Sequence, residues 1–344
     1  MRNARGVWSV VLLLGGVAGA VAAAGCGAGG AERPPESAAS ADARLAEPER
    51  SVPEASHAVQ EGESKLSAND AAGARALFEQ ALADNPNDAR AALDLGIALE
   101  TLQDLKGAEA AYRRAIASQS DFAEALNNLG VLLRDRGELK EAVELLRRAA
   151  AAHADSASVH TNLALALEDA GELKGASAEY ARAVEIEPHD PMLRANYGLL
   201  LIKLDDKAGA AAQLQKALEA AQGDRPALLA IGNGLRRAGD AQGALRAMQA
   251  AVAAGGDATP ALLSELALAQ RAADQRDAAI ATLEKAISLD EKYATAHYLL
   301  ANMLASDKRF PEAAKHYQRY LKLAPDGEQA KQARDRLALI SKKK

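Results

Sequence analysis

The sequence predicts an all-α protein built from tandem pairs of helices, and three observations support this fold class. Small residues recur every 34 residues, with one step of 35. Between them, apolar residues follow helical spacing in two segments per repeat. Aromatic residues make up 3% of the chain and apolar residues 49%, so we expect a core of mainly Ala and Leu. Such a core suits many small helix–helix contacts better than a β-sandwich.

Residues 1–26 have the features of an export signal. Arg2 and Arg5 precede an uncharged apolar run from Val7 to Ala24. The run leads into Ala23-Ala24-Gly25-Cys26, which resembles a bacterial lipobox, although that family favours Leu where this chain has Ala23. The resemblance implies lipidation of Cys26, the only cysteine, after cleavage just before it. The alternatives are an ordinary signal peptide cut near Ala24 and an uncleaved anchor.

Residues 27–54 are rich in Gly, Ala, Pro, Ser and Glu without any period. Such a segment buries little apolar surface, and we expect it to be a disordered linker. A flexible chain of this length has ends roughly 30 Å apart. It would therefore hold a folded domain away from a membrane, or serve only as a spacer.

Three series of residues define the repeat. The first contains small residues, the second contains only Ala, and four residues after each Ala comes a larger apolar residue. The first series is Gly62, Gly96, Gly130, Ala164, Gly198, Gly232, Ala267 and Ala301. The second is Ala74, Ala108, Ala142, Ala176, Ala210, Ala244, Ala279 and Ala313. The third is Phe78, Tyr112, Leu146, Tyr180, Leu214, Met248, Leu283 and Tyr317.

This pattern resembles the tetratricopeptide repeat family, and the resemblance covers residues 55–327. It implies a right-handed superhelical solenoid of about eight helix-turn-helix repeats. The expected repeats are residues 55–88, 89–122, 123–156, 157–190, 191–224, 225–259, 260–293 and 294–327. Residues 328–344 are expected to form a C-terminal capping helix, and the alternative is that this basic segment is a docking tail. Because no helix pair buries its own apolar face, neighbouring pairs must stack.

Glycine and proline mark the expected helix ends. Gly137, Gly171 and Gly239 share one position between the paired helices and suit a left-handed C-cap. Pro86, Pro188 and Pro325 share a late position and are expected to stop the second helix. Five glycines directly precede the Ala series, and inside a helix each costs up to about 1 kcal/mol relative to Ala. They are Gly73, Gly107, Gly175, Gly209 and Gly243.

Asparagines recur two residues before the small-residue series, at Asn128, Asn162 and Asn196. This resembles the asparagine ladder of some family members, whose amides hydrogen-bond an extended peptide backbone. An amide suits this because it both donates and accepts. The resemblance implies a peptide-binding groove along the first helices, and we predict four further lining residues. These are Asn127, Asn233, Arg236 and Arg271, whose arginines can pair with acidic groups. The alternative is that these residues form an ordinary solvated helix face.

Catalysis, cofactors and nucleic acid find no support in the sequence. The six histidines are scattered, and His160 and His297 share one repeat position, which indicates packing. No zinc-ligand spacing or phosphate loop occurs. A net charge of −6 argues against nucleic acid as the main partner. We therefore expect a protein that is not an enzyme and holds no cofactor or metal.

The function expected from this pattern is an interaction scaffold that holds a protein or peptide partner. A lipid at Cys26 would tether it to a membrane of the bacterial cell envelope, facing the periplasm or the cell surface. Without the lipid it would be a soluble periplasmic or secreted protein. One alternative is a pilotin-like lipoprotein that assists pilus or secretion-pore assembly. Another is a regulatory arm of an enzyme complex whose catalytic subunit is a separate chain.

Overall fold

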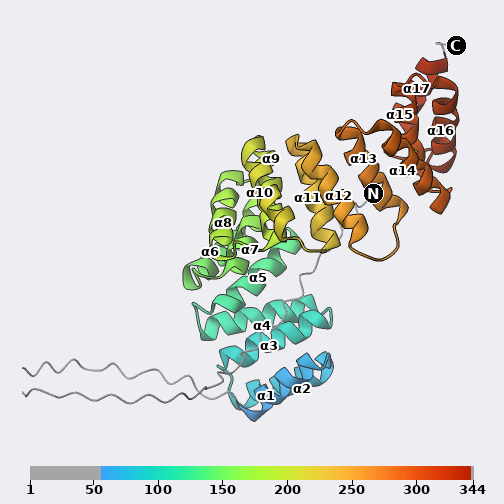
Figure 1. Cartoon of the computed structure of the whole chain (residues 1–344). Coiled ribbons are helices and arrows are strands. Elements are labelled where there is room, and N and C mark those ends of the chain that lie inside the picture. Colours follow the sequence, from blue (N-terminus) through green and yellow to red (C-terminus); the bar gives the residue numbers. More distant parts are fainter. Residues whose placement is uncertain (1–55, 342–344) are drawn as a thin grey trace, which may run out of the picture. The chain divides into compact units, whose positions relative to one another are not determined.

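The computed structural model describes residues 56–341, which form seventeen α-helices and no strands (Figure 1). The first helices of the eight pairs are α1 (His57–Ser67), α3 (Ala89–Thr101), α5 (Ala123–Arg136), α7 (Ala157–Asp169), α9 (Pro191–Lys203), α11 (Arg225–Ala238), α13 (Pro260–Ala272) and α15 (Ala294–Ser306). The second helices are α2 (Ala71–Asp84), α4 (Leu105–Ser118), α6 (Leu139–Ala152), α8 (Leu173–Ile186), α10 (Lys207–Ala220), α12 (Ala241–Ala253), α14 (Arg276–Leu289) and α16 (Phe310–Leu323). The predicted all-α repeat architecture is confirmed. The predicted export signal, Cys26 and the linker lie outside the described residues.

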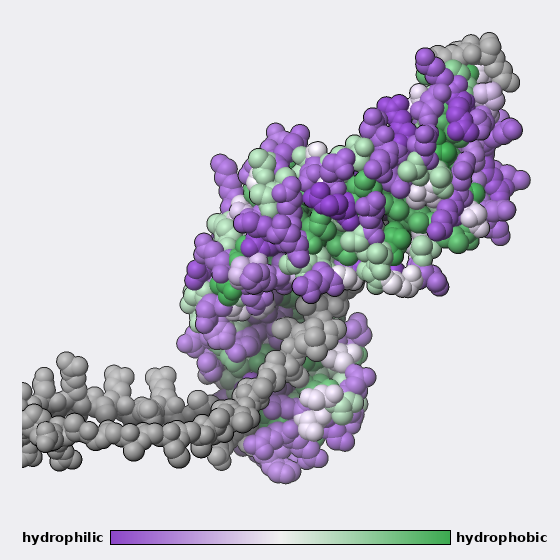
Figure 2. Space-filling model, viewed as in Figure 1, coloured by the Kyte–Doolittle hydropathy of each residue, from purple (hydrophilic) through white to green (hydrophobic). Residues whose placement is uncertain are grey.

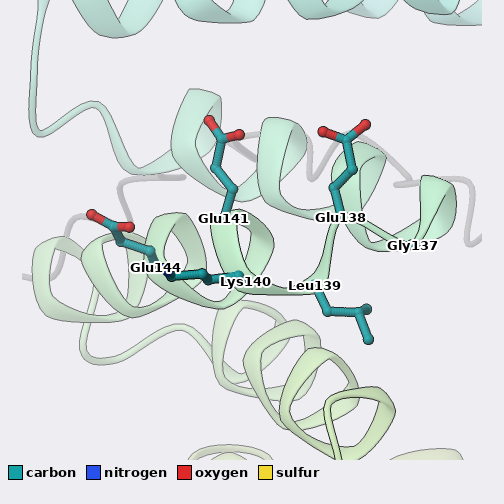
Figure 3. Close-up of a pocket in the computed structure, with 6 residues that line it drawn as sticks. All are labelled: Gly137, Glu138, Leu139, Lys140, Glu141 and Glu144. Carbon is teal, nitrogen blue, oxygen red and sulfur yellow. The ribbon is translucent and has the colours of Figure 1, made fainter.

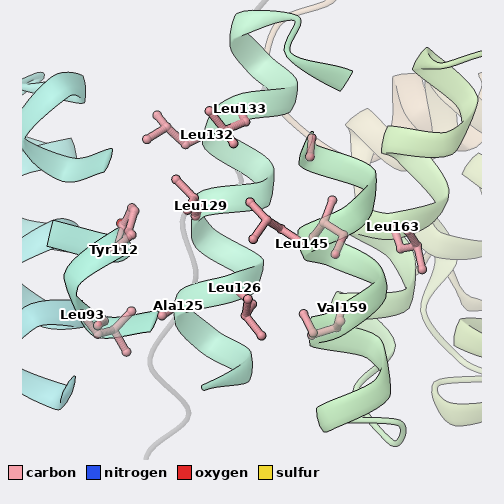
Figure 4. Packing of buried hydrophobic residues seen from close by; sticks show 14 of the residues in the cluster. Leu93, Tyr112, Ala125, Leu126, Leu129, Leu132, Leu133, Leu145, Val159 and Leu163 are labelled. Atoms are coloured by element: carbon pink, nitrogen blue, oxygen red, sulfur yellow. The ribbon is translucent and has the colours of Figure 1, made fainter. Parts of the chain in front are cut away.

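Each helix packs most extensively against its partner in the pair and then against the next pair along the chain. All eight residues of the Ala series are fully buried, and the larger apolar series is at most 1% exposed. Figure 4 shows how α5 takes part in two interfaces: Leu126, Leu129 and Leu133 lie between Tyr112 on one side and Leu145 on the other. The core therefore continues from one pair to the next, as stacking requires.

The small-residue series makes room for the large residue of the same pair. A Cβ atom on Gly96 would lie 2.3 Å from Cε1 of Tyr112, and one on Gly130 would lie 2.6 Å from Cγ of Leu146. Leu214 also reaches the following pair, where a Cβ on Gly234 would lie 2.8 Å from its Cδ1. The large residue thus fills space both within its own pair and between pairs.

The turn inside every helix pair contains one residue in the left-handed conformation. Gly137, Gly171 and Gly239 have φ of 85°, 81° and 94°, which confirms the predicted caps. The other five pairs place a non-glycine residue there, with φ between 60° and 64°: Asn69, Gln103, Asp205, Asp274 and Lys308. In the first pair the next amide, that of Asp70, donates to the Lys65 carbonyl at 2.8 Å. This is the Schellman pattern that closes a helix C-terminus.

Aspartates at the start of the second helices account for four of the five glycines before the Ala series. Asp70 accepts a hydrogen bond from the Gly73 amide at 2.9 Å, and a Cβ on Gly73 would lie 2.4 Å from Asp70 Oδ2. The same contact is made at Gly107, Gly209 and Gly243. Gly175 differs, because Glu172 at its N-cap makes no such bond. The predicted proline stops are confirmed: α2, α8 and α16 each end two residues before the proline.

The last described helix, α17 (Ala330–Ser341), packs on the final pair. It begins two residues later than the predicted start at residue 328. Ala333 is fully buried, and Ile340 is 6% exposed. Tyr298 of α15 donates to Gln332 at 2.8 Å. The helix thus covers apolar surface that a ninth pair would otherwise bury.

Candidate functional site

Several polar contacts join the first helices of neighbouring pairs and define one surface. Arg90 of α3 pairs with Glu63 of α1 at 2.9 Å, and Asn162 of α7 donates to Asn127 of α5 at 2.9 Å. Lys203 of α9 pairs with Glu168 of α7. We call this surface the odd-helix face. It comprises these residues and the following ones at equivalent or adjacent repeat positions: Asp94, Glu100, Asn128, Arg134, Asp135, Asp169, Asn196, Leu199, Leu229, Asn233, Arg236, Arg237 and Arg271.

Three of the predicted asparagines form one hydrogen-bonded cluster. Asn127 is only 7% exposed, and its Oδ1 accepts from Asn162 Nδ2. Its Nδ2 donates to Asn128 Oδ1 at 3.2 Å. Asn162 retains its carbonyl oxygen and one N–H, and both it and Asn128 are half-buried. Asn127 therefore fixes the orientation of two amides that keep hydrogen-bonding capacity for another group.

The remaining predicted residues lie further along the odd-helix face. Asn196 on α9 is half-buried, and its side chain makes no hydrogen bond to any described residue. Arg236 donates to Asn233 at 3.3 Å, so these two are brought together on α11. Arg271, at the end of α13, is exposed and pairs with no carboxylate among residues 56–341.

Charge is distributed unevenly along the odd-helix face. Acidic side chains dominate α1 to α7: Glu63, Asp94, Glu100, Asp135, Glu168 and Asp169. Cations dominate the first helices α9, α11 and α13: Lys203, Arg236, Arg237 and Arg271, beside one carboxylate, Glu265, at the repeat position of the asparagines. In the view of Figure 2, apolar residues gather over α11 to α13, with hydrophilic residues around them. Leu199 and Leu229 on α9 and α11 are half-buried. A partner lying along the face therefore meets two chemically different halves.

Asp94 occupies the position on α3 that asparagine occupies on α5, α7 and α9, and sequence reasoning did not single it out. Its side chain is 5% exposed and accepts from Arg90 at 3.0 Å. Burial raises the pKa of Asp94 to about 6, although Arg90 acts in the opposite direction. The signal available in the sequence was an acidic residue at the repeat position where three later repeats have asparagine.

His160, Arg194 and His297 occupy one repeat position and make equivalent contacts. Each reaches the carbonyl six residues earlier: Ala154 at 3.2 Å, Pro188 at 2.6 Å and Glu291 at 3.2 Å. Each also reaches the second helix of its pair: Glu179 at 2.7 Å, Gln213 at 2.6 Å and His316 at 3.0 Å. The predicted packing role of the two histidines is confirmed, because these side chains fix the inter-pair loop.

A shallow hollow of about 600 Å³ lies away from the odd-helix face, at the start of α6 (Figure 3). Glu138, Glu141 and Glu144 line it beside Gly137 and Leu139. Glu138 pairs with Arg136 at 2.6 Å, and Glu141 pairs with Arg113 at 2.8 Å. Two of its three carboxylates are thus already neutralised by neighbouring arginines.

Within residues 56–341, no three His, Cys, Asp or Glu side chains are grouped so that they could hold a metal ion. The helices of the same segment are all too short or too polar to cross a bilayer.

Comparison with solved structures shows likeness to helical repeat proteins. A structure of pilF from Pseudomonas aeruginosa is 22% identical, with a TM-score of 0.50, and covers 57% of this chain and 89% of its own. PilW, described as a widely conserved type IV pilus biogenesis factor, is 21% identical with a TM-score of 0.50. It covers 57% of this chain and 91% of its own. At these identities the likeness concerns the fold alone.

Family comparison identifies the repeat directly, whereas no curated protein matches the chain. One tetratricopeptide repeat model matches residues 59–121, 102–157 and 264–328, and a second matches residues 133–195. The matches fall on the helix pairs described above and together span more than half of the 344 residues. The chain therefore belongs to the tetratricopeptide repeat family.

Proposed function

We propose that this protein is a non-catalytic scaffold that binds an extended segment of a partner protein along the odd-helix face. The observation that carries the proposal is the cluster of Asn127, Asn128 and Asn162. It holds two amides in fixed orientations on adjacent first helices.

A peptide backbone offers one N–H and one C=O per residue, and an amide side chain complements both. Asn162 keeps a free acceptor and a free donor, and Asn196 keeps all of its capacity. Because Asn127 holds the orientation of the first two amides, less conformational entropy is lost when a peptide binds. This arrangement supports recognition of the main chain rather than of one particular sequence.

The cationic half of the odd-helix face adds a preference for acidic and apolar residues in the bound segment. Arg236 and Arg271 lack carboxylate partners among the described residues. Acidic side chains of a bound segment would satisfy them with charge-assisted hydrogen bonds. Half-buried Leu199 and Leu229 would receive apolar side chains of the same segment.

The direct test replaces Asn128, Asn162 and Asn196 together by Ala. The probe is a dodecamer peptide selected from a random library on the purified chain, and the readout is its dissociation constant. We expect about 10-fold weaker binding or more, since each lost hydrogen bond contributes about 0.5–1.5 kcal/mol. The matched control is Asn85→Ala with Asn87→Ala, because both asparagines are exposed in the α2–α3 turn. Unchanged binding by the triple variant at unchanged helical content would contradict the proposal.

We also propose that a lipid on Cys26 tethers the scaffold to a membrane of the bacterial cell envelope. The support is the sequence around Ala23-Ala24-Gly25-Cys26. Cys26→Ser should abolish incorporation of a fatty-acid probe in cells, whereas labelling that persists in this variant would exclude the lipid anchor. Cross-linking in cells, followed by identification of the partner, would decide between the two alternative roles. A pilus or secretion-pore subunit as the partner would indicate a pilotin-like protein, and an enzyme subunit would indicate a regulatory arm.

A further inference from the structure

The last turns of the first helices carry a charge pattern that reverses once along the stack. The pattern occupies two repeat positions, four and five residues after each member of the small-residue series. On α3, α5 and α7 the charged residues at these positions are Glu100, Arg134, Asp135, Glu168 and Asp169. On α9, α11 and α13 they are Lys203, Arg236, Arg237 and Arg271. Four carboxylates and one arginine give −3 over the first three helices, and four cations give +4 over the next three.

Helix electrostatics account for only the second half of this pattern. The C-terminal end of a helix carries a partial negative charge, which favours cations in the last turn and disfavours anions. Arg236 and Arg271 follow this preference at the ends of α11 and α13. Glu100, Asp135 and Asp169 oppose it at the ends of α3, α5 and α7. The stability of these helices therefore does not explain the acidic half.

The acidic half presents carboxylates that are accessible and only partly neutralised. Arg134, whose side chain is 16% exposed, serves two of them: Asp135 at 2.8 Å and Asp169 at 3.9 Å. These two carboxylate side chains come from adjacent first helices and are 57% and 54% exposed. Glu100 is half-buried and accepts from the uncharged hydroxyl of Tyr112, which leaves its negative charge in place. A cation of a partner therefore meets carboxylates that a single arginine does not neutralise.

The cationic half has no carboxylates at the same two repeat positions. Lys203 reaches back to Glu168 on the preceding first helix. Arg237 occupies the position of Lys203 on α11, but Ile202 stands on α9 where Glu168 stands on α7. Within residues 56–341, Arg237 and Arg236 consequently pair with no carboxylate. The pair of Glu168 and Lys203 thus marks the boundary between the two halves.

We propose that the odd-helix face binds a partner segment whose basic and acidic residues form two separate blocks, the basic block on α3 to α7 and the acidic block on α9 to α13. This inference rests on the proposed function and names the chemistry of its partner. Packed helices lie about 8–10 Å apart, and an extended chain advances about 3.3 Å per residue. Every third side chain therefore meets the next first helix, and six first helices correspond to roughly 18 residues. Mixing the two blocks sets like charges opposite one another, so the order of charges determines specificity.

The test compares two peptides of about 18 residues with identical composition. Each carries three Lys and three Glu, one at every third residue, among Gly, Ser and Thr. One peptide keeps Lys and Glu in separate blocks, and the other alternates them. We expect the full chain to bind the block peptide about 10-fold more tightly in about 20 mM salt, and both peptides equally in about 1 M salt, where charges are screened. Equal binding in low salt, or no binding of either peptide, would overturn the inference.

A charge reversal in the chain locates the preference. Asp135→Lys combined with Asp169→Lys should abolish the preference for the block peptide and favour a peptide with six Glu. The matched control is Glu144→Lys with Glu219→Lys, which changes the net charge equally at exposed positions of the second helices α6 and α10. This control should keep the preference of the wild type. If both double variants lose it alike, only the overall charge matters and the inference fails.

The proposed function is judged separately, by the selected dodecamer and the triple asparagine variant. If that variant loses affinity for the dodecamer while the block and alternating peptides bind equally, the groove stands without a preference for charge order. If it binds the dodecamer normally, the groove fails and this inference fails with it. Light scattering of the free chain examines a second copy as the occupant. Salt-sensitive dimers that disappear with Asp135→Lys and Asp169→Lys would assign the face to self-association and overturn the inference.

Discussion

Substitution of Gly96 by Ala tests the packing rule on which the stack of helix pairs depends. The added Cβ would lie 2.3 Å from Cε1 and 2.5 Å from Cδ1 of Tyr112. Carbon atoms in contact normally lie about 3.5–4.0 Å apart, so the ring must move by more than about 1 Å. Tyr112 is fully buried and held by Glu100 through its hydroxyl, so such movement disturbs both packing and a hydrogen bond.

The expected magnitude combines two opposing effects. Overpacking a well-filled core costs about 1–3 kcal/mol. Replacing Gly by Ala within a helix gains up to about 1 kcal/mol. We therefore expect Gly96→Ala to lower the free energy of unfolding by about 1–2 kcal/mol.

Gly175→Ala is the matched control, since a Cβ there would meet only Leu167, at 3.5 Å and beyond. It should be neutral or stabilising by up to about 1 kcal/mol. Urea unfolding followed by circular dichroism measures both variants, with the slope m checked for a change of cooperativity. If Gly96→Ala proves as stable as Gly175→Ala, close packing of the small residue against the large one is not what holds the pair.

Three further predictions concern the buried charges and the end of the stack. The pKa of Asp94, raised to about 6, means that ionising this group costs stability. Wild type should therefore lose up to roughly 3 kcal/mol relative to Asp94→Asn as the pH rises from about 3 to 7, and equal pH profiles would refute this. Burial lowers the pKa values of His297 and His316 below 6.5, so stability should fall as the pH drops through 6.5. His316→Gln should show a weaker acid dependence in thermal unfolding, and an unchanged dependence would exclude this pair as its source. Deletion of residues 328–344 should expose the apolar face of the last pair and cause association in size-exclusion chromatography; a monodisperse, equally stable product would show that α17 covers nothing essential.

The fold could be predicted because one physical requirement recurs in every repeat. A small residue must face a large one where two helices cross, and Gly130 with Leu146 meets this in the structure as the sequence pattern indicates. Stop signals such as Pro188 act locally, so the helix ends they mark were also predictable.

Two local features were not predictable from residue type. Gln103 and Lys308 adopt the left-handed conformation with φ of 64° and 62°, a geometry that residue preference assigns to glycine. The hydrogen bonds that close the C-terminus of the first helix in each of these pairs impose this left-handed conformation. The glycine at residue 73 was expected to weaken α2, but it accommodates the capping carboxylate of Asp70.

The candidate site was predictable as a set of positions but not as a network. The repeat period placed Asn128 and Asn162 on equivalent surfaces. It did not reveal that buried Asn127 joins them, because that depends on side-chain directions across two helices. The Tyr180 hydroxyl has no hydrogen-bond partner, whereas that of the equivalent Tyr112 donates to Glu100, and the repeat pattern does not reveal this difference either.

Site-specific photo-cross-linking tests most directly whether the odd-helix face is the binding surface. A photoreactive amino acid at Leu199 on α9 and another at Lys216 on α10 probe the two helices of one pair. Leu199 is half-buried on the proposed face, whereas Lys216 is exposed on the second helix. We predict that the selected dodecamer cross-links at residue 199 and not at residue 216. Cross-linking at residue 216 alone, with affinity intact in both variants, would contradict the account.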